Sequence, residues 1–426
     1  MKEQHNHSME NKKNTLIINF PTMMAGGVES YFAALMKSCI EKGYRVIWIT
    51  SEPFLSKVAF EGLLDNPGLE IVLTRSWMHY LDTPRISLTE DERVLMFTCE
   101  PIEYILSDKI RTEAGTKQFL HYLAIPNFAG KDYFPDQYLK NKGLRKLVWR
   151  FLHRILNRAA ESNCILGFDL KHLVTYEEYY QIPLPDKETK IAPFFDAESV
   201  RFDMENTKAR CAERKEKFVI TSCARFEFPH KAYLLGLVDA FAKVKEKHSQ
   251  TVLQLVGYGS GQQELESRIM ALPEFVRKDI HMLGMLSPDV LEKYYKSSQL
   301  IVGLAGSVAK GAQCGIPALV VRHYHPDCET YGFFEDTSEM ALCEDPGMDI
   351  VPFIEECITM DPELYLQHAE NGFAREASER DSIITSIEEC FEQAEKFSPS
   401  VVRTSREMLV AKLLYIACCI LRKLGR

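Results

Sequence analysis

Residues 218–321 alternate short apolar runs with amphipathic segments, and this alternation constrains the fold more than any other feature. Three runs, FVITSC, VLQLVGYG and QLIVGLAG, are rich in β-forming residues and nearly uncharged, which is typical of buried strands. The segment HKAYLLGLVDAFAKVKEKH has apolar residues at helical spacing: Leu234, Val238, Phe241 and Val244. Strand–helix–strand units of this kind form a parallel sheet, so the sequence predicts an α/β protein.

Charged residues and glycines gather just after the predicted strands. The ligand crevice of an open parallel sheet lies at the carboxyl ends of its strands. Cations at this edge attract anions, and glycines let the backbone approach a ligand closely. The sequence therefore predicts an anion-binding site formed by Arg225, Lys231, Gly257, Gly259, Gly261, Gly306 and Ser307.

The order ARF, GLVDAF, LQLVGYGSGQQELESRI, HMLGMLS and CGIPALVV resembles the nucleotide-sugar half of GT-B glycosyltransferases, above all the retaining family 4. The resemblance covers roughly residues 15–395 and implies two Rossmann-like domains facing across a cleft. It also implies transfer of a hexose from a nucleotide sugar to a glycan or lipid-linked glycan. Such enzymes build cell-surface polysaccharides, including capsule and lipopolysaccharide, and this resemblance implies no metal cofactor.

Four segments are expected along the 426 residues. They are a disordered tail (1–14), an acceptor-side domain (15–205), a nucleotide-sugar domain (206–395) and a crossover or membrane-surface helix (396–426). The polar stretch 203–217 suits an interdomain link. The tail has no apolar core, and no stretch reaches the ~18–20 apolar residues of a spanning helix. We expect a cytoplasmic protein, peripheral to the inner face of the plasma membrane.

By the resemblance, Arg225 and Lys231 occupy the R-x(5)-K positions that grip the donor diphosphate. Breaking the sugar–phosphate bond places negative charge on the leaving diphosphate, so two cations aimed at it stabilise the transition state. Gly26 and Gly27 match the family's first glycine-rich loop, which reaches the diphosphate from the other domain. A tight strand-to-helix turn is the alternative interpretation of these two glycines.

Other donor contacts are expected with less specific motifs. Gly257 and Gly259 follow the second strand of this half, and a turn that binds no phosphate is the alternative. The region around Gly284 matches the place where family members contact the nucleotide base. Gly306 and Ser307 begin a helix that could bind phosphate at its N-terminus.

The sequence departs from the family at its E-x(7)-E motif. Alignment on CGIP puts Val302 and Lys310 at the two glutamate positions, so both carboxylates are missing. Lys310, expected in the first turns of its helix, is interpreted as an altered donor contact. A solvent-exposed substitution and a loss of catalysis are the alternatives.

His121 lies in FLHYLAIPN and is expected to end a strand. The resemblance often places a histidine facing the reacting sugar near this point, which makes His121 a catalytic candidate. A core histidine is the alternative. The histidines, aspartate and cysteine of HYHPDCETYG fit no metal-site spacing, so a loop without metal is predicted there.

Residues 138–162 combine an apolar stripe with a dense set of cations. A helix of this kind can lie on an anionic membrane, where each cation adds ~1 kcal/mol. A core-packed helix with a solvated face is the alternative. The predicted membrane contacts are Lys140, Lys142, Arg145, Lys146, Arg150 and Arg154. The apolar segment 406–426 suits either a crossover helix or an interfacial anchor.

Composition excludes some classes of protein. The net charge of −9 argues against a general nucleic-acid binder, and 12 scattered cysteines suggest reduced core thiols. Two other functions stay open. One is an inactive glycosyltransferase-like binding protein in a polysaccharide assembly, and the other is a GT-B nucleotide-sugar epimerase. The epimerase needs acidic residues in the cleft and leaves the basic helix without a role.

Overall fold

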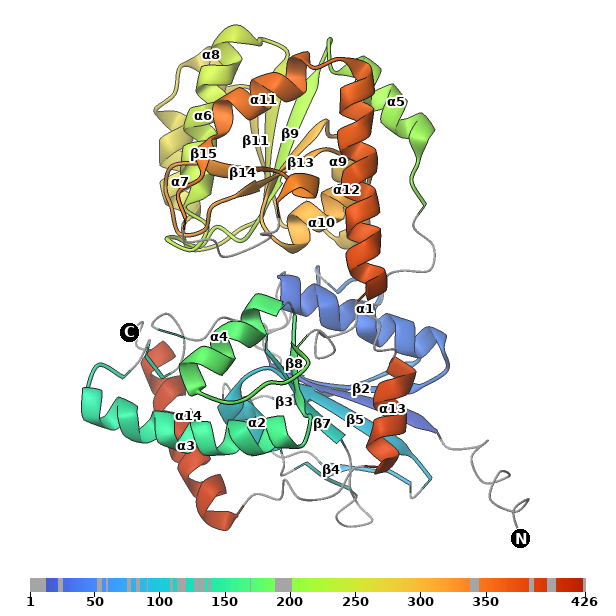
Figure 1. The fold of residues 1–426 in the computed structure, drawn as a ribbon, viewed down its shortest axis with the longest axis vertical. Helices are drawn as coiled ribbons and strands as arrows, with labels where there is room; N and C mark the ends of the chain where they lie inside the picture. The colour runs from blue at the N-terminus through green and yellow to red at the C-terminus, as the bar shows by residue number, and fades with distance from the viewer. Residues whose placement is uncertain are drawn as a thin grey trace.

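The computed structural model describes most of the 426 residues. The described ranges are 13–21, 26–51, 56–58, 60–74, 78–81, 85–89, 91–107, 110–112, 120–125, 130, 135–136, 139–168, 170–187, 201–337, 345–382, 387–396 and 404–423. Most of the predicted tail, 1–12, lies outside them. The described chain forms two α/β domains, one above the other in Figure 1.

A six-stranded parallel sheet forms the centre of the first domain, in the order β3-β2-β1-β5-β7-β8. Its strands are β1 (Asn14–Asn19), β2 (Arg45–Ser51), β3 (Leu69–Thr74), β5 (Arg93–Thr98), β7 (Leu120–Ile125) and β8 (Ile165–Gly167). Alternate residues serve opposite faces, since Leu16 and Ile18 belong to one hydrophobic cluster and Ile17 to another.

Helices cover this sheet, together with a small parallel pair of strands. The helices are α1 (Gly27–Glu41), α2 (Pro101–Ser107), α3 (Lys142–Glu161) and α4 (Leu170–Tyr180), with the short η2 (His79–Leu81). The pair consists of β4 (Arg85–Ile86) and β6 (Arg111–Thr112). Tyr31, Phe32 and Leu35 of α1 are buried in the larger cluster, as the helical spacing of these residues predicts.

The second domain has a seven-stranded sheet in the order β11-β10-β9-β12-β13-β14-β15. The strands are β9 (Phe218–Cys223), β10 (Thr251–Val256), β11 (Ile280–Gly284), β12 (Leu300–Gly303), β13 (Ala318–Val321), β14 (Glu329–Phe333) and β15 (Met348–Asp349). The first five are parallel, and β14 and β15 are antiparallel to their neighbours. β14 lies in a segment for which the sequence predicted only a loop.

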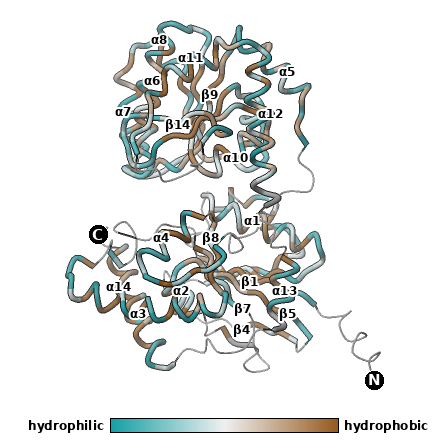
Figure 2. The backbone as a smooth tube through the Cα atoms, viewed as in Figure 1, coloured by the Kyte–Doolittle hydropathy of each residue, from teal (hydrophilic) through white to brown (hydrophobic). Residues whose placement is uncertain are grey.

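Eight α-helices surround the second sheet within the described residues. They are α5 (Met204–Glu213), α6 (Tyr233–Lys247), α7 (Gln262–Met270), α8 (Glu274–Arg277), α9 (Pro288–Lys296), α10 (Gly306–Gln313), α11 (Ile350–Thr359) and α12 (Pro362–Ser382), with the short η4 (Phe334–Asp336). Figure 2 shows the hydrophobic colour concentrated in the strands, with hydrophilic segments outside. Each domain therefore has its own core.

The predicted polar link at 203–217 is wrong, because this stretch forms α5 and packs on the second domain. Arg210 donates to the carbonyl oxygens of Cys314 (2.9 Å) and Gly315 (2.7 Å). Arg214, which is 2% exposed, donates to the carbonyl oxygens of Cys357 (2.9 Å) and Met360 (2.6 Å). The two guanidinium groups can be buried here because backbone carbonyl oxygens at the ends of helices accept their hydrogen bonds.

The chain returns to the first domain earlier than predicted. After α12, which runs down the side of the second domain, the helix α13 (Ile387–Lys396) lies on the first (Figure 1). Cys390 and Phe391 belong to the first domain's core, and Gln393 accepts from Tyr122 Oη at 2.8 Å. The predicted crossover at residue 396 is therefore too late.

The helix α14 (Ser405–Lys423) also packs on the first domain, against α2. Its residues Ala411 and Tyr415 are buried in the core, while Leu409 and Leu413 are 58% and 60% exposed. The alternative of a crossover helix thus accounts for one face of this segment. Across the described helices, no segment is long and apolar enough to cross a membrane. Most of the described cysteines are buried, as predicted for core thiols.

Candidate functional site

Arg225 and Lys231 lie in the loop that follows β9, at the carboxyl edge of the second sheet. The backbone holds this loop in place, because Phe226 N–H donates to Tyr258 O (2.7 Å) and Lys231 N–H donates to Glu227 O (2.8 Å). Arg225 Nε lies 3.8 Å from a carboxylate oxygen of Glu227 and the side chain is 37% exposed. The predicted pair of cations is therefore brought together at the expected edge.

Lys231 is the more enclosed of the two cations. Its pKa is lowered to about 8. Burial is the main cause, the positive charge of Arg225 adds to it, and the negative charge of Glu227 opposes both. Its Nζ lies 3.2 Å from Nε2 of His323, which follows β13. A lysine whose charge is this easily lost gains most from an anionic ligand.

The glycine loop after β10 packs against the Arg225–Lys231 loop. A Cβ on Gly257 would lie 1.8 Å from the carbonyl oxygen of Ala224, and one on Gly259 would lie 2.5 Å from that of Phe226. Both glycines have positive φ, 144° and 153°. The close backbone approach predicted for a ligand is thus made to the protein's own chain, which explains these glycines without any bound phosphate.

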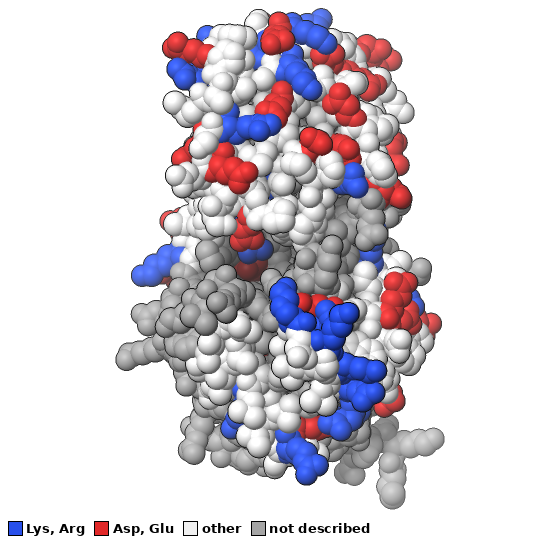
Figure 3. All heavy atoms as spheres, turned by 90° about the vertical axis from the view of Figure 1, so that its left-hand side faces the viewer, with Lys and Arg blue, Asp and Glu red and all other residues white. Residues whose placement is uncertain are grey.

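Gly284 ends β11 beside Gly257, whose N–H donates to its carbonyl oxygen at 2.9 Å. The next residue, Met285, meets the first domain, since Ser56 Oγ lies 3.2 Å from its sulfur. Gly284 has φ of 68° and open space where a Cβ would stand. The predicted base-contact region therefore faces the boundary between the domains, where Figure 3 shows the surface hollowed.

Gly26 and Gly27 begin α1 on the opposite side of this boundary. Gly26 is the N-cap, and the Glu29 side chain folds back so closely that a Cβ on Gly26 would be 2.3 Å from Oε2. Burial raises the pKa of Glu29 to about 7, while the charge of Arg225 in the other domain opposes the rise. Glu29 at the start of α1 in the first domain is therefore close enough to Arg225 of the second domain for their charges to interact.

The start of α10 differs in part from its prediction. Gly306 is exposed, but Ser307 Oγ donates to Leu304 O at 2.8 Å within the turn. Lys310 is in the last turn of this eight-residue helix, where a cation is favoured by the dipole, and not in its first turns. Its Nζ is 3.8 Å from the carboxylate of Glu292 on α9. Val302 is fully buried in β12.

The prediction that His121 ends a strand is wrong. His121 is the second residue of β7 and is 5% exposed. Its Nε2 lies 2.9 Å from Thr98 Oγ1, and its ring centroid lies 4.2 Å from that of Tyr104. Because the cleft edge is at the other end of a parallel strand, His121 belongs to the core and the structure gives its catalytic role no support.

The basic helix α3 has one face buried in the core and another exposed to solvent. Val148, Leu152 and Ile155 are buried, whereas Leu144 and Leu147 are 48% and 64% exposed among cations. Figure 3 shows Lys and Arg gathered on the first domain. Three cations of the helix also make ion pairs with other parts of the chain. Arg145 pairs with Asp136 (3.3 Å), and both Arg154 (3.3 Å) and Arg158 (2.8 Å) pair with Glu407 of α14.

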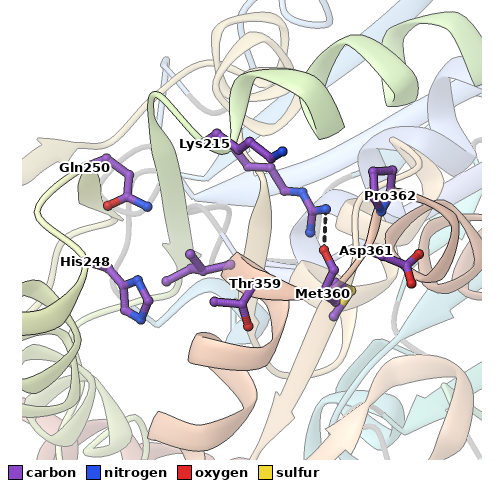
Figure 4. A pocket seen from close by; sticks show the side chains of 9 residues that line it. Lys215, His248, Gln250, Thr359, Met360, Asp361 and Pro362 are labelled. Carbon is purple, nitrogen blue, oxygen red and sulfur yellow. Dashed lines mark hydrogen bonds between the residues drawn. The ribbon is translucent and has the colours of Figure 1, made fainter.

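A pocket of about 480 Å³ lies away from these residues (Figure 4). Lys215 and Gln250 line it and precede β9 and β10, so the pocket is at the amino ends of the strands. A doubly wound sheet binds ligands at the opposite edge.

Among the described residues, the loop histidines His323 and His325 belong to no cluster that could hold a metal; the one such group is Glu335, Asp336 and His368.

Sequence reasoning missed Glu29 and His323 as parts of this site. Glu29 carries a local signal, since it stands three residues after the N-cap Gly26, where a glutamate reaches back to the helix start. His323 carries no such local signal. It lies 92 residues from Lys231 in the chain and meets it only because the fold brings the ends of β9 and β13 together.

A family comparison matches the second domain. Residues 203–325 fit the model of the family described as glycosyl transferases group 1. This range contains Arg225, Lys231, the glycine loop and His323, and the match confirms the resemblance to group 1 glycosyltransferases. The sequence matched none of the curated proteins with which it was compared.

Solved structures share the fold over nearly the whole chain. HepE from Anabaena, in complex with UDP and glucose, has a TM-score of 0.54 at 13% identity, covering 91% of this chain and 99% of that one. WaaG, a glycosyltransferase involved in lipopolysaccharide biosynthesis, has a TM-score of 0.52 at 15% identity, covering 89% and 99%. TarM from S. aureus has a TM-score of 0.53 at 8% identity, covering 91% and 99%. The predicted GT-B architecture is confirmed.

Proposed function

We propose that this chain, with its group 1 glycosyl transferase domain on a GT-B fold, is a nucleotide-sugar-dependent hexosyltransferase. The observation that carries the proposal is the pairing of Arg225 with the enclosed Lys231 at the carboxyl edge of the second sheet. The structure of HepE with UDP and glucose supports a nucleotide-sugar donor. The first domain would carry the acceptor, a glycan or lipid-linked glycan of a cell-surface polysaccharide.

In this reaction the bond between the sugar's anomeric carbon and the phosphate oxygen breaks, and the electron pair goes to the leaving nucleoside diphosphate. An acceptor hydroxyl oxygen forms the new glycosidic bond, and its proton passes to the leaving diphosphate. Arg225 and Lys231 stabilise the charge on the diphosphate, so no divalent metal is needed for that purpose. Retention of configuration is proposed from the resemblance to family 4.

Calorimetric titration with UDP, GDP, ADP and CMP tests the donor site. We expect selective binding of one nucleotide, and a loss of at least about tenfold in affinity in Lys231→Ala. A hydrogen bond to a charged group contributes roughly 1.5–3 kcal/mol, which corresponds to about one to two powers of ten in affinity. Failure of every nucleotide to bind, or equal binding by both proteins, would contradict the proposal.

A binding protein without turnover is the second candidate function. The observation that favours it is the loss of both motif carboxylates, with Val302 buried and Lys310 paired to Glu292. Incubation with the sugar donor of the nucleotide that binds separates the two. Release of nucleoside diphosphate supports the enzyme, whereas tight binding without release supports the second candidate.

A membrane surface is proposed as the partner of the first domain. Leu144 and Leu147 are exposed between the exposed cations Lys142, Lys146 and Arg150 of α3. Apolar side chains among cations suit the headgroup region of an anionic leaflet. This contact would bring the cleft to a lipid-linked acceptor at the inner face of the plasma membrane.

Vesicle flotation tests the membrane contact. Replacing Lys140, Lys142, Arg145, Lys146 and Arg150 with Gln should release the protein from vesicles containing anionic lipid. The control has the same charge change on the second domain, at the exposed Lys208, Lys215, Lys217, Lys278 and Lys293. Unchanged binding by the first variant, or equal loss by both, would argue against a specific contact through α3.

A further inference from the structure

We propose that His323 positions Lys231 for the leaving diphosphate, as a neutral acceptor that directs the ammonium group without cancelling its charge. The inference rests on the proposed function, because it concerns the same donor site. It assigns a role to His323, which follows β13 and for which the sequence predicted only a loop.

The contact joins two loops at the carboxyl edge of the second sheet. Lys231 follows β9 and His323 follows β13, and Lys231 Nζ lies 3.2 Å from His323 Nε2. β12 separates the two strands in the sheet. The hydrogen bond therefore holds the Lys231 side chain to the loop after β13, two strands away in the sheet. Without it, this long side chain would have more rotamers open to it.

The chemistry of the pair defines the state of the imidazole. An ammonium group only donates hydrogen bonds, so Nε2 of His323 accepts, and the ring carries its proton on Nδ1. The imidazole is neutral in this arrangement. A carboxylate at the same place would form an ion pair and offset the positive charge that the diphosphate needs.

Stacked rings hold His323 in position. Its ring lies 4.9 Å from that of His230 with an interplanar angle of 13°, and Tyr324 lies 5.1 Å from His230. Burial, then the charges of Lys231 and Arg225, lower the pKa of His230 to about 3, so this ring is neutral at physiological pH. A positioning residue needs this kind of support from its neighbours. Arg225 and Glu227 are the other charged groups that act on Lys231.

The test uses inorganic pyrophosphate, which has the two phosphoryl groups of the leaving group and no base. Calorimetric titration at pH 7 compares the wild type with Lys231→Ala, His323→Gln, His323→Glu and His323→Ala. Gln and Glu have nearly the same shape and differ in charge. We expect His323→Gln to bind within about threefold of the wild type, and His323→Glu at least about tenfold more weakly. His323→Ala should fall between them.

A second readout separates positioning from general structural damage. A carboxylate beside Lys231 stabilises its ammonium form, so the pH at which binding weakens should rise by at least about one unit in His323→Glu relative to His323→Gln. General damage to the fold would weaken binding without moving this pH. If either variant fails to fold, the matched pair His323→Asn and His323→Asp replaces it.

The outcomes are distinguishable. Wild-type protein that binds no pyrophosphate, or binds it as Lys231→Ala does, contradicts the proposed donor site. Wild-type binding that is lost in Lys231→Ala but unchanged in all His323 variants overturns this inference and leaves the proposed function standing. Equal affinities and equal pH profiles for the Gln and Glu variants also overturn it.

Discussion

Diphosphate binding should weaken steeply as pH rises through the pKa of Lys231. Burial and the charge of Arg225 lower this pKa from 10.5 to about 8 in the free protein. A bound diphosphate favours the charged ammonium and raises the pKa again. Binding is therefore coupled to uptake of a proton wherever part of the free protein holds a neutral amine.

The magnitude follows from the fraction of charged lysine. With a pKa of about 8, roughly 90% of the molecules carry the ammonium at pH 7 and roughly 10% at pH 9. The apparent dissociation constant is inversely proportional to the competent fraction, so affinity should fall about tenfold between these values. At pH 8 binding should take up about half a proton per diphosphate.

Two measurements check this prediction, with the nucleoside diphosphate that binds in the titration described above. The affinity is measured from pH 7 to 9 for the wild type and for Lys231→Arg, whose guanidinium stays charged throughout. The difference between the two profiles cancels the ligand's own titration. Calorimetry at pH 8 in two buffers of different ionisation enthalpy gives the proton uptake directly. Parallel profiles, or binding without uptake of a proton, would refute the reasoning.

Three further predictions concern stability. Burial raises the pKa of Glu29 from 4.5 to about 7, so the folded protein resists its ionisation. Between pH 4.5 and 7 the free energy of unfolding of the wild type should therefore fall by up to about 3 kcal/mol relative to that of Glu29→Gln, measured by urea unfolding at both pH values. Equal losses in the two proteins would contradict this. Gly257→Ala should destabilise the second domain by at least ~2 kcal/mol, because its Cβ would overlap Ala224 O, whereas Gly306→Ala, with no atom within 4 Å, should change little in the same unfolding assay. Arg214→Met should lower the free energy of unfolding by roughly 2–4 kcal/mol, since two buried carbonyl groups lose their donor, while Lys215→Met at the exposed neighbouring position should have almost no effect; comparable losses in both would show that the guanidinium contacts are unimportant.

Local patterns predicted the sheet strands and the position of Arg225 and Lys231 well. FVITSC and VLQLVGYG became β9 and β10, and the cations after β9 stand at the carboxyl edge of the sheet. These features depend on short-range periodicity and on the general geometry of parallel sheets. Both can be read from a few neighbouring residues.

The failures depend on contacts between distant residues. The polar composition of 203–217 predicted a link, because the carbonyl acceptors that bury Arg210 and Arg214 come from residues more than 100 positions away. His121 was placed at the wrong end of its strand, since the bounds of an apolar run do not show where pairing begins. Lys310 changed from the first turns to the last because α10 ends after eight residues.

The return of α13 and α14 to the first domain makes that domain discontinuous in sequence. Its core combines residues 16–184 with residues 387–419, and the whole second domain is encoded between them. During synthesis on the ribosome, the second domain can fold as soon as its own residues emerge. The first domain must wait with part of its hydrophobic surface uncovered until residues 387–419 have been made. This order of events predicts that a nascent chain arrested before α13 contains a folded second domain attached to an incomplete, chaperone-dependent first domain.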